Sequence, residues 1–267
     1  MEHDHLERRV SRRRLIGGIG TLGIGGLGGI AAIGALLPAH GARTSPAEPA
    51  GFAADAALFA GAPTCALSPE ATQGPYYFDA GKLRGDIREG RPGVRLRLAL
   101  KVQEARTCRP LPDAVVDIWQ CDAIGVYSGA EAQSKADHDS PPSFADISDK
   151  TVMPDLKPAD STRYLRGAQV AGADGVVRFT TIWPGWYPGR TVHVHVLVLV
   201  DEKRVLSTQL MFDEALNKKV MAREPYAGHT GRDTFNHTDP VFTDGMLMKV
   251  VEDGDGYLGT MVLSAGR

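Results

Sequence analysis

The segment Val94-Arg-Leu-Arg-Leu-Ala-Leu-Lys-Val102 places an aliphatic side chain at every second position. The basic residues Arg95, Arg97 and Lys101 stand between them. Successive side chains of an extended chain point to opposite faces, so one face of this segment is apolar and the other is largely basic. The pattern predicts a half-buried β-strand.

The segments that follow this strand have the same character. Ala114-Val-Val-Asp-Ile-Trp-Gln120 is the next expected strand, after a turn at residues 110–113. Two hairpins should join residues 164–171 to 175–181 and residues 191–200 to 204–212, and residues 246–251 and 257–263 should be the last strands. Only residues 214–223 have a helical pattern, and the polar stretch 129–158 is expected to be a long surface loop beside a functional site. The sequence therefore predicts an all-β fold, a β-sandwich of mostly antiparallel strands with long loops and little helix.

The charge balance argues against a nucleic-acid partner. The 267 residues include 30 basic and 32 acidic side chains, a formal net charge of −2. Five of the arginines lie before residue 15, so the rest of the chain is more acidic than the total suggests. A protein that binds phosphate backbones would need a basic surface instead.

The N-terminus has the features of an export signal. Arginines dominate residues 8–14, residues 15–37 carry no charge, and small residues follow at 38–42. The string Ser11-Arg-Arg-Arg-Leu15 resembles a twin-arginine signal, which implies transport of an already folded protein. The uncharged stretch is also long enough for an uncleaved membrane anchor, which is the alternative. We expect an exported protein, periplasmic or extracellular, that meets the membrane only during export.

This interpretation divides the chain into three parts. Residues 1–42 are the expected signal, and residues 43–64, rich in Ala, Pro and Gly, are the expected flexible linker. Residues 65–267 are the expected catalytic domain. It contains three cysteines, and we favour a Cys65–Cys108 disulfide because Cys121 ends a strand that should be buried; three free thiols are the alternative.

Two histidines in Thr191-Val-His-Val-His195 are candidate metal ligands. Residues i and i+2 of a strand face the same side, so the imidazoles of His193 and His195 could share one metal ion. The same alternation sends Val192, Val194 and Val196 to the opposite side, into a core. The alternative is a pair of solvent-facing histidines on a strand surface.

Two tyrosines accompany this pair. Tyr127 follows a strand and a turn at Gly125, and Tyr187 lies between Pro184-Gly and Pro188-Gly. A tyrosine taken alone is more often an amphipathic residue at the rim of a pocket. Other polar residues have simpler interpretations: His229 and His237 as surface residues, Tyr164 as a strand residue, and Asp117 and Asp122 as structural.

Taken in order, these segments resemble the intradiol ring-cleaving dioxygenases, the family of protocatechuate 3,4-dioxygenase and catechol 1,2-dioxygenase. The resemblance covers residues 65–265. The matching segments are Ser68-Pro-Glu-Ala-Thr-Gln-Gly-Pro-Tyr-Tyr77, Trp119-Gln120 with Gly125 and Tyr127, Phe179-x-Thr-Ile-x-Pro-Gly-x-Tyr187-Pro, Arg190-x-x-His193-x-His195, and Thr208-Gln-Leu210 with Phe212.

The resemblance implies a non-haem iron(III), Fe(3+), cofactor. Its ligands would be Tyr127, Tyr187, His193 and His195. Phenolate oxygen is a hard donor that suits a hard trivalent ion, and two tyrosinates with one hydroxide cancel its charge. The implied reaction is cleavage of a catechol by O2 between its two hydroxylated carbons, which gives a muconate-type diacid. Tyr187 would leave the metal when the catechol binds, and Tyr127 would stay.

The resemblance also implies roles for the residues around the metal. Arg190 would bind substrate and stabilise developing negative charge, and Gln209 would orient substrate or oxygen. Tyr76 and Tyr77 would form part of the pocket wall. Well-known relatives form dimers or larger assemblies, so a homo-oligomer is one expectation.

Two departures leave the identity of the catechol open. The segment from Tyr187 to His193 is shorter than in well-known members, and Gly189 stands where a tryptophan is common. Candidate substrates are catechol itself, a carboxylated or substituted catechol, or a hydroxyquinol.

Two other functions compete with this one: a copper or zinc enzyme that uses the histidine pair, and a non-catalytic β-sandwich that binds carbohydrate or cell-wall material. Zinc prefers nitrogen, sulfur and carboxylate ligands, which argues against a zinc site built with tyrosines.

Overall fold

The computed structural model describes Phe59, residues 65–139 and residues 153–266. The expected signal, the expected linker apart from Phe59, and residues 140–152 lie outside the described residues. Among the helices that are described, none is long and apolar enough to cross a membrane. The elements in chain order are β1 (Arg95–Glu104), β2 (Val115–Trp119), α3 (Glu131–Asp139), β3 (Arg166–Val170), β4 (Val176–Ile182), β5 (His193–Val200), β6 (Lys203–Met211), α4 (Glu214–Met221), the short helices η1 (Tyr226–Gly228), η2 (Asn236–Thr238) and η3 (Asp244–Met246), β7 (Lys249–Asp253) and β8 (Gly256–Ala265).

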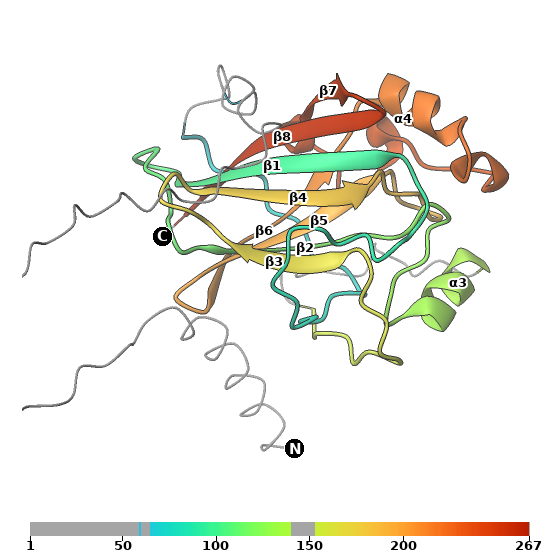
Figure 1. The fold of residues 1–267 in the computed structure, drawn as a ribbon, viewed down its shortest axis with the longest axis horizontal. Coiled ribbons are helices and arrows are strands. Elements are labelled where there is room, and N and C mark those ends of the chain that lie inside the picture. The colour runs from blue at the N-terminus through green and yellow to red at the C-terminus, as the bar shows by residue number, and fades with distance from the viewer. Residues whose placement is uncertain (1–58, 60–64, 140–152, 267) are drawn as a thin grey trace, which may run out of the picture. The chain divides into compact units, whose positions relative to one another are not determined.

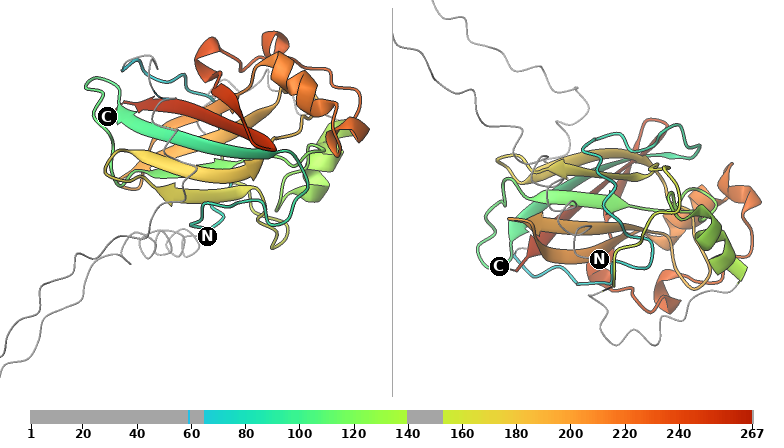
Figure 2. Two further views of the ribbon diagram at one scale, coloured as in Figure 1. Left: turned by 45° about the horizontal axis from the view of Figure 1, so that its top comes forward. Right: turned by 90° about the horizontal axis from the view of Figure 1, so that it is seen from below.

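The strands form two four-stranded sheets packed face to face, which confirms the predicted sandwich (Figure 1). One sheet has the order β4-β1-β8-β7 and the other the order β3-β2-β5-β6. The pairings between these eight strands are antiparallel except that of β1 with β8. Helices α3 and α4 lie at the same end of the sandwich (Figure 2).

The core between the sheets follows from strand alternation. Leu96, Leu98 and Leu100 of β1 are fully buried in it, as the opening segment of the sequence predicts. Each such side chain contributes about 1.5–3 kcal/mol of transfer free energy on burial. Val194 and Val196 of β5 enter the same core from the opposite sheet.

The β3-β2-β5-β6 sheet is buried on its other face as well. A second apolar cluster covers that face, and it includes Leu197 and Leu199 of β5. Strand β5 is therefore buried along almost its whole length. The remaining members of the cluster are Tyr76, Tyr77, Trp119, Cys121, Tyr127, Ala130 and Tyr187.

The helices correct one prediction and confirm another. The predicted loop at 129–158 is wrong at its start, because residues 131–139 form α3, which is polar and buries only Ser134. The predicted helix at 214–223 is α4, with Asp213 as N-cap accepting from the backbone N–H groups of Ala215 and Leu216. The favoured disulfide is also confirmed: Cys65 is bonded to Cys108, with their Cα atoms 5.0 Å apart, and Cys121 is a buried free thiol.

Candidate active site

The register of the second sheet aligns four side chains in a row. Arg166 of β3 lies opposite Trp119 of β2, Trp119 lies opposite His195 of β5, and His195 lies opposite Gln209 of β6. Directly opposed residues in neighbouring strands project to the same face of a sheet. The row therefore crosses the whole sheet on the face away from the sandwich core, where the indole of Trp119 stacks on the imidazole of His195 at 4.8 Å and 3°.

The two histidines converge on one point. His193 and His195 are each 1% exposed, and their Nε2 atoms lie 3.0 Å apart. Burial lowers the pKa of His193 to about 3 and the pKa of His195 well below its ordinary value, and the charge of Arg190 acts in the same direction. The solvent-facing alternative is therefore wrong, whereas the prediction that the neighbouring valines face the core is confirmed.

A backbone contact sets the orientation of the first histidine. His193 Nδ1 lies 2.6 Å from the carbonyl oxygen of Thr191, an arrangement in which Nδ1 carries the proton and donates it. In a neutral ring, Nε2 of His193 then presents its lone pair toward His195. Metal-binding histidines are commonly oriented by such a donor contact at the other ring nitrogen.

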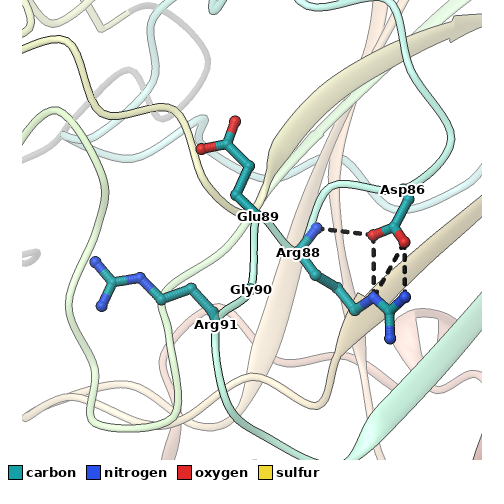
Figure 3. Close-up of a pocket in the computed structure, with 5 residues that line it drawn as sticks. All are labelled: Asp86, Arg88, Glu89, Gly90 and Arg91. Carbon is teal, nitrogen blue, oxygen red and sulfur yellow. Dashed lines mark hydrogen bonds and ion pairs between the residues drawn. The ribbon is translucent and has the colours of Figure 1, made fainter.

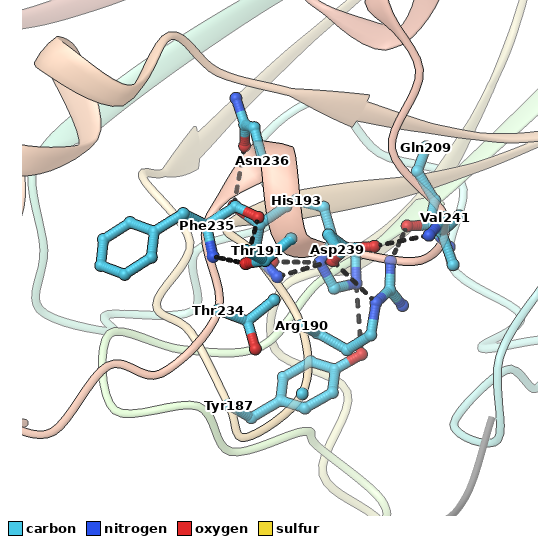
Figure 4. Close-up of polar contacts among 12 residues, drawn as sticks. Tyr187, Arg190, Thr191, His193, Gln209, Thr234, Phe235, Asn236, Asp239 and Val241 are labelled. Atoms are coloured by element: carbon cyan, nitrogen blue, oxygen red, sulfur yellow. Dashed lines mark hydrogen bonds and ion pairs between the residues drawn. The ribbon is translucent and has the colours of Figure 1, made fainter. Parts of the chain in front are cut away.

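Tyr187 approaches the same point from the turn before β5. Its hydroxyl oxygen lies 3.3 Å from His193 Nε2 (Figure 4). The turn is closed by the backbone N–H of Arg190 donating to the carbonyl of Tyr187, at 3.1 Å, and Gly189 adopts a φ of 78° within it. Burial raises the pKa of Tyr187 to about 12, although the neighbouring charge of Arg190 acts to lower it.

Tyr127 completes the cluster from the turn after β2. Its ring is fully buried, 5.8 Å from the ring of Tyr187 and 6.3 Å from that of His195. Burial raises the pKa of Tyr127 well above its usual value, and the nearby Tyr187 hydroxyl adds to the effect. Asp122 holds the turn by accepting from the backbone N–H groups of Ile124 and Val126, which is the structural role expected for it.

These donors fit a metal ion that accepts nitrogen and phenolate ligands. Two metal–nitrogen bonds of about 2.0–2.1 Å that meet near a right angle would place their nitrogens about 3 Å apart, close to the observed spacing. The Tyr127 hydroxyl is buried with no hydrogen-bonding partner of normal geometry, a costly state that a metal bond would relieve. Among the described residues, no group of three or more His, Cys, Asp or Glu could hold a metal, so the further side-chain donors beside the two histidines are the tyrosines.

Arg190 is buried beside the donors and held from two sides. Its Nε donates to Asp239 at 3.0 Å, and its Nη2 donates to Oε1 of Gln209 (Figure 4). Asp239 also accepts from the backbone N–H groups of Thr191, at 2.7 Å, and Val241, at 2.8 Å. Burial opposes the charge of Arg190, but the negative groups at Tyr187 and Asp239 outweigh it and raise the pKa of Arg190. Sequence reasoning missed Asp239, because no local pattern marks it.

Residues 68–77, the entry segment, cover the donors. Tyr76 stacks on Tyr127 with ring centroids 4.4 Å apart, and its hydroxyl donates to Asp137 of α3 at 2.5 Å. Gly74, at φ 71°, approaches His195 so closely that a Cβ would lie 3.2 Å from Cε1 of the ring. Asp137 was also missed, because the sequence predicts a loop where α3 forms.

Tyr77 lies one layer further from the donors. Its ring contacts Trp119, with centroids 4.5 Å apart, and its hydroxyl donates to Asp117 at 3.2 Å. The structure therefore brings Tyr76, and not Tyr77, against the predicted ligand tyrosines.

Three residues were expected to lie on the surface or in a strand: His229, His237 and Tyr164. His237 is exposed as expected, but His229 is half-buried and stacks on Trp186 at 4.2 Å, so its assignment to the surface is only partly right. Tyr164 precedes β3 instead of lying within it, and its buried hydroxyl donates to Glu131 at 2.9 Å.

A surface pocket elsewhere on the molecule is separate from this site. It is lined by Asp86, Arg88, Glu89, Gly90 and Arg91 (Figure 3). Its Asp86 and Arg88 pair with each other at 2.7 Å. None of the converging tyrosines and histidines lines it.

Comparisons with known proteins agree with this geometry. A family model described as Dioxygenase matches residues 72–228. An intradiol ring-cleavage dioxygenase from Tetranychus urticae is 31% identical, with a TM-score of 0.65 over 76% of this chain and 95% of that one. The dioxygenase domain of a dioxygenase carbohydrate-binding protein fusion from Streptomyces sp. SirexAA-E is 30% identical, with a TM-score of 0.51 over 74% and 98% of the two chains.

A third comparison supports the fold alone. Chlorocatechol 1,2-dioxygenase from Pseudomonas putida is 20% identical, with a TM-score of 0.50 over 75% of this chain and 72% of that one. A comparison with curated proteins found no match. The matched residues include the whole cluster of tyrosines and histidines together with Arg190 and Gln209. The chain belongs to the intradiol ring-cleavage dioxygenase family.

Proposed function

We propose that this enzyme uses O2 to cleave a catechol-type aromatic between its two hydroxylated carbons. The product is a muconate-type dicarboxylic acid that retains both oxygen atoms of O2. The proposed cofactor is iron(III) held by Tyr127, Tyr187, His193 and His195. The observation that supports it most strongly is the convergence of Tyr187 Oη, His193 Nε2 and His195 Nε2 beside the buried, unpartnered hydroxyl of Tyr127.

The charge of the donor set suits a buried site. When bound, iron(III) activates the catechol ring toward O2. Two tyrosinates and one hydroxide balance its three positive charges if both histidines are neutral. Burial keeps His193 and His195 neutral by lowering the pKa of each ring. A site with so little net charge avoids a large desolvation penalty.

Tyr187 and Arg190 supply the proton and charge chemistry. In the proposed reaction, Tyr187 Oη accepts the proton of one catechol hydroxyl and the hydroxide of the charge count accepts the other, so that the substrate binds as a dianion. The positive charge of the Arg190 guanidinium acts on the Tyr187 hydroxyl. In the proposed reaction, the same charge lies where negative charge builds on the substrate. Both ends of the Gln209 amide are engaged, one by Arg190 and the other by the carbonyl of Thr72 at 3.3 Å. Gln209 therefore positions Arg190 against the entry segment.

Oxygen uptake by the iron-loaded full chain tests the function. The panel contains catechol, a carboxylated catechol, an alkyl-substituted catechol and a hydroxyquinol. We expect one of them to be consumed with equimolar O2, giving a diacid whose mass is the sum of the two reactants. The Tyr127→Phe variant should lose this activity. Tyr257→Phe, which removes the hydroxyl of a tyrosine that packs in the sandwich core, is the matched control and should keep the activity. Full iron content and full activity in Tyr127→Phe would refute the ligand assignment.

We also propose that the chain is exported by the twin-arginine route. The proposal is based on Arg12 and Arg13 within the Ser11–Leu15 string, which lies outside the described residues. Replacement of both arginines by lysine should leave the enzyme inside the cell. Continued export of that variant at the wild-type level would contradict the proposal.

A further inference from the structure

Arg166 is a buried cation that forms no ion pair within the part of the chain that the structure describes. It is the first residue of β3 and is 1% exposed. Among the described residues, no carboxylate forms a salt bridge with it, and its Nη1 has no hydrogen-bonding partner. A buried charge without an opposite charge is strongly unfavourable, so a residue in this state needs an explanation.

The hydrogen bonds of Arg166 all go to the residue after Tyr127. Nε donates to Ser128 Oγ at 2.9 Å and to the Ser128 carbonyl at 3.2 Å, and Nη2 donates to the same carbonyl at 2.9 Å. The guanidinium carbon lies 4.0 Å from the centre of the Phe78 ring and 5.9 Å from the centre of the Tyr127 ring. The side chain therefore clamps the backbone that carries Tyr127 and places a positive charge beside its ring.

The geometry directs the charge of Arg166 toward Tyr127. The guanidinium lies among buried residues, with the Phe78 and Tyr127 rings beside it. The Tyr127 hydroxyl is buried with no hydrogen bond of normal geometry. Negative charge on the Tyr127 oxygen would therefore be felt by this guanidinium across the ring.

We propose that Arg166 is a positioning residue of the metal centre, which clamps the Tyr127 segment through Ser128 and holds a positive charge beside the ring of Tyr127, where it stabilises the electrons of the phenolate. This rests on the proposed function, since Tyr127 is a phenolate only as a metal ligand. Arg166 is two strands away from His195 in the sheet but faces the ring of Tyr127. Its charge therefore acts more on the phenolate than on the metal.

The expected signature is spectroscopic. A positive charge near a phenolate stabilises its electrons and raises the energy needed to transfer one to iron(III). Loss of this charge should move the tyrosinate-to-iron absorption band to longer wavelength and make the iron(III)/iron(II) reduction potential more negative. A role confined to packing predicts neither shift.

Two substitutions separate charge from hydrogen bonding. Arg166→Gln removes the charge but can still donate to the Ser128 carbonyl, and Arg166→Lys keeps the charge without the guanidinium fork. Arg84→Met is the matched control, because Arg84 donates to the Arg166 carbonyl from the partly exposed side. All are measured in the iron-loaded full chain, with the thermal unfolding midpoint as the test of folding.

We expect the long-wavelength shift and the more negative potential in Arg166→Gln, with Arg166→Lys and Arg84→Met close to wild type. If Arg166→Gln does not fold, Arg166→Met, another neutral variant, should show the same shifts. An unshifted band in a folded neutral variant overturns the proposal, as do equal shifts in the lysine and neutral variants. A wild-type protein without any visible band overturns the proposed metal centre itself, so the two failures are distinguishable.

Discussion

The structure allows an estimate of the stability that is lost when the ion pair between Arg190 and Asp239 is broken. Both side chains are fully buried and their atoms lie 3.0 Å apart. The carboxylate also accepts from two backbone N–H groups, so it fixes both the guanidinium and the start of the loop at Thr191. The substitution Asp239→Asn keeps the shape of the side chain and removes its charge.

The expected loss of stability is large for a single substitution. Removing one member of a buried pair costs about 3–5 kcal/mol, because the other charge stays buried. Asparagine retains an oxygen that can accept from Thr191 or Arg190, so we expect about 3 kcal/mol. A typical domain is stable by about 5–15 kcal/mol, so the variant should still fold.

Urea unfolding of the full chain measures this loss directly. Asp255→Asn is the matched control, because Asp255 also pairs with an arginine, at 2.8 Å, but is 83% exposed. Its unfolding midpoint should stay close to that of wild type, because an exposed ion pair contributes little to stability. Equal unfolding midpoints for the two variants would show that the buried pair does not stabilise the fold as argued.

The same variant should lose activity through the displacement of Arg190. Loss of one preorganised electrostatic contact at a reacting centre typically costs about 10²–10³-fold in kcat. We expect a loss toward the lower part of this range in kcat, with a smaller change in KM, because the guanidinium is displaced and not removed. Unchanged kcat in a folded Asp239→Asn protein would mean that the orientation of Arg190 does not limit the reaction.

Two further perturbations follow from the contacts. Gly74→Ala should reduce iron retention more than Gly81→Ala does. Both positions have positive φ, so each alanine adds about 1–2 kcal/mol of strain, but only at Gly74 would the new Cβ meet His195. Equal iron content in the two variants would contradict this prediction. Asp253→Asn should cost about 1 kcal/mol at neutral pH, because hydrogen bonds from Arg97 hold the pKa of Asp253 below its usual value. A lowered pKa stabilises the fold above the unfolded pKa of about 4. The difference from wild type should therefore shrink below that pH and vanish once the pH has fallen through the lower pKa of the folded state. A pH-independent difference in urea midpoint would refute this explanation.

Local patterns were sufficient to predict the strands and the histidine pair. Alternation in β5 assigns the valines to the core and His193 and His195 to the opposite face, and it depends on no distant residue. The boundaries were less accurate: β5 begins at His193 and not at Thr191, because the preceding residues belong to the turn that carries Tyr187.

The contacts that Arg166 and Asp239 make around the donors could not be predicted from the sequence. Arg166 meets the Tyr127 segment only because the sheet order places β3 beside β2. Asp239 reaches Arg190 from a loop 49 residues further along the chain. Contacts of this kind depend on strand order and register, which alternation within one strand does not specify.

Helix α3 was missed for a different reason. Its residues are polar and only Ser134 is buried, so it has no apolar stripe that would mark a helix in the sequence. Asp137 nevertheless contacts the site through the Tyr76 hydroxyl. Tertiary contact, and not amphipathic pattern, is what identifies this helix as part of the site.

The visible absorption spectrum of the iron-loaded full chain tests the central claim most directly. Coordination by Tyr127 and Tyr187 predicts a burgundy protein with a single iron ion per chain, whose colour disappears on reduction or chelation of the iron. The colour should change in Tyr187→Phe and in Tyr127→Phe, and should persist unchanged in Tyr257→Phe. A colourless protein that instead holds zinc, or a colour that neither ligand substitution alters, would contradict the claim that these tyrosines bind iron(III).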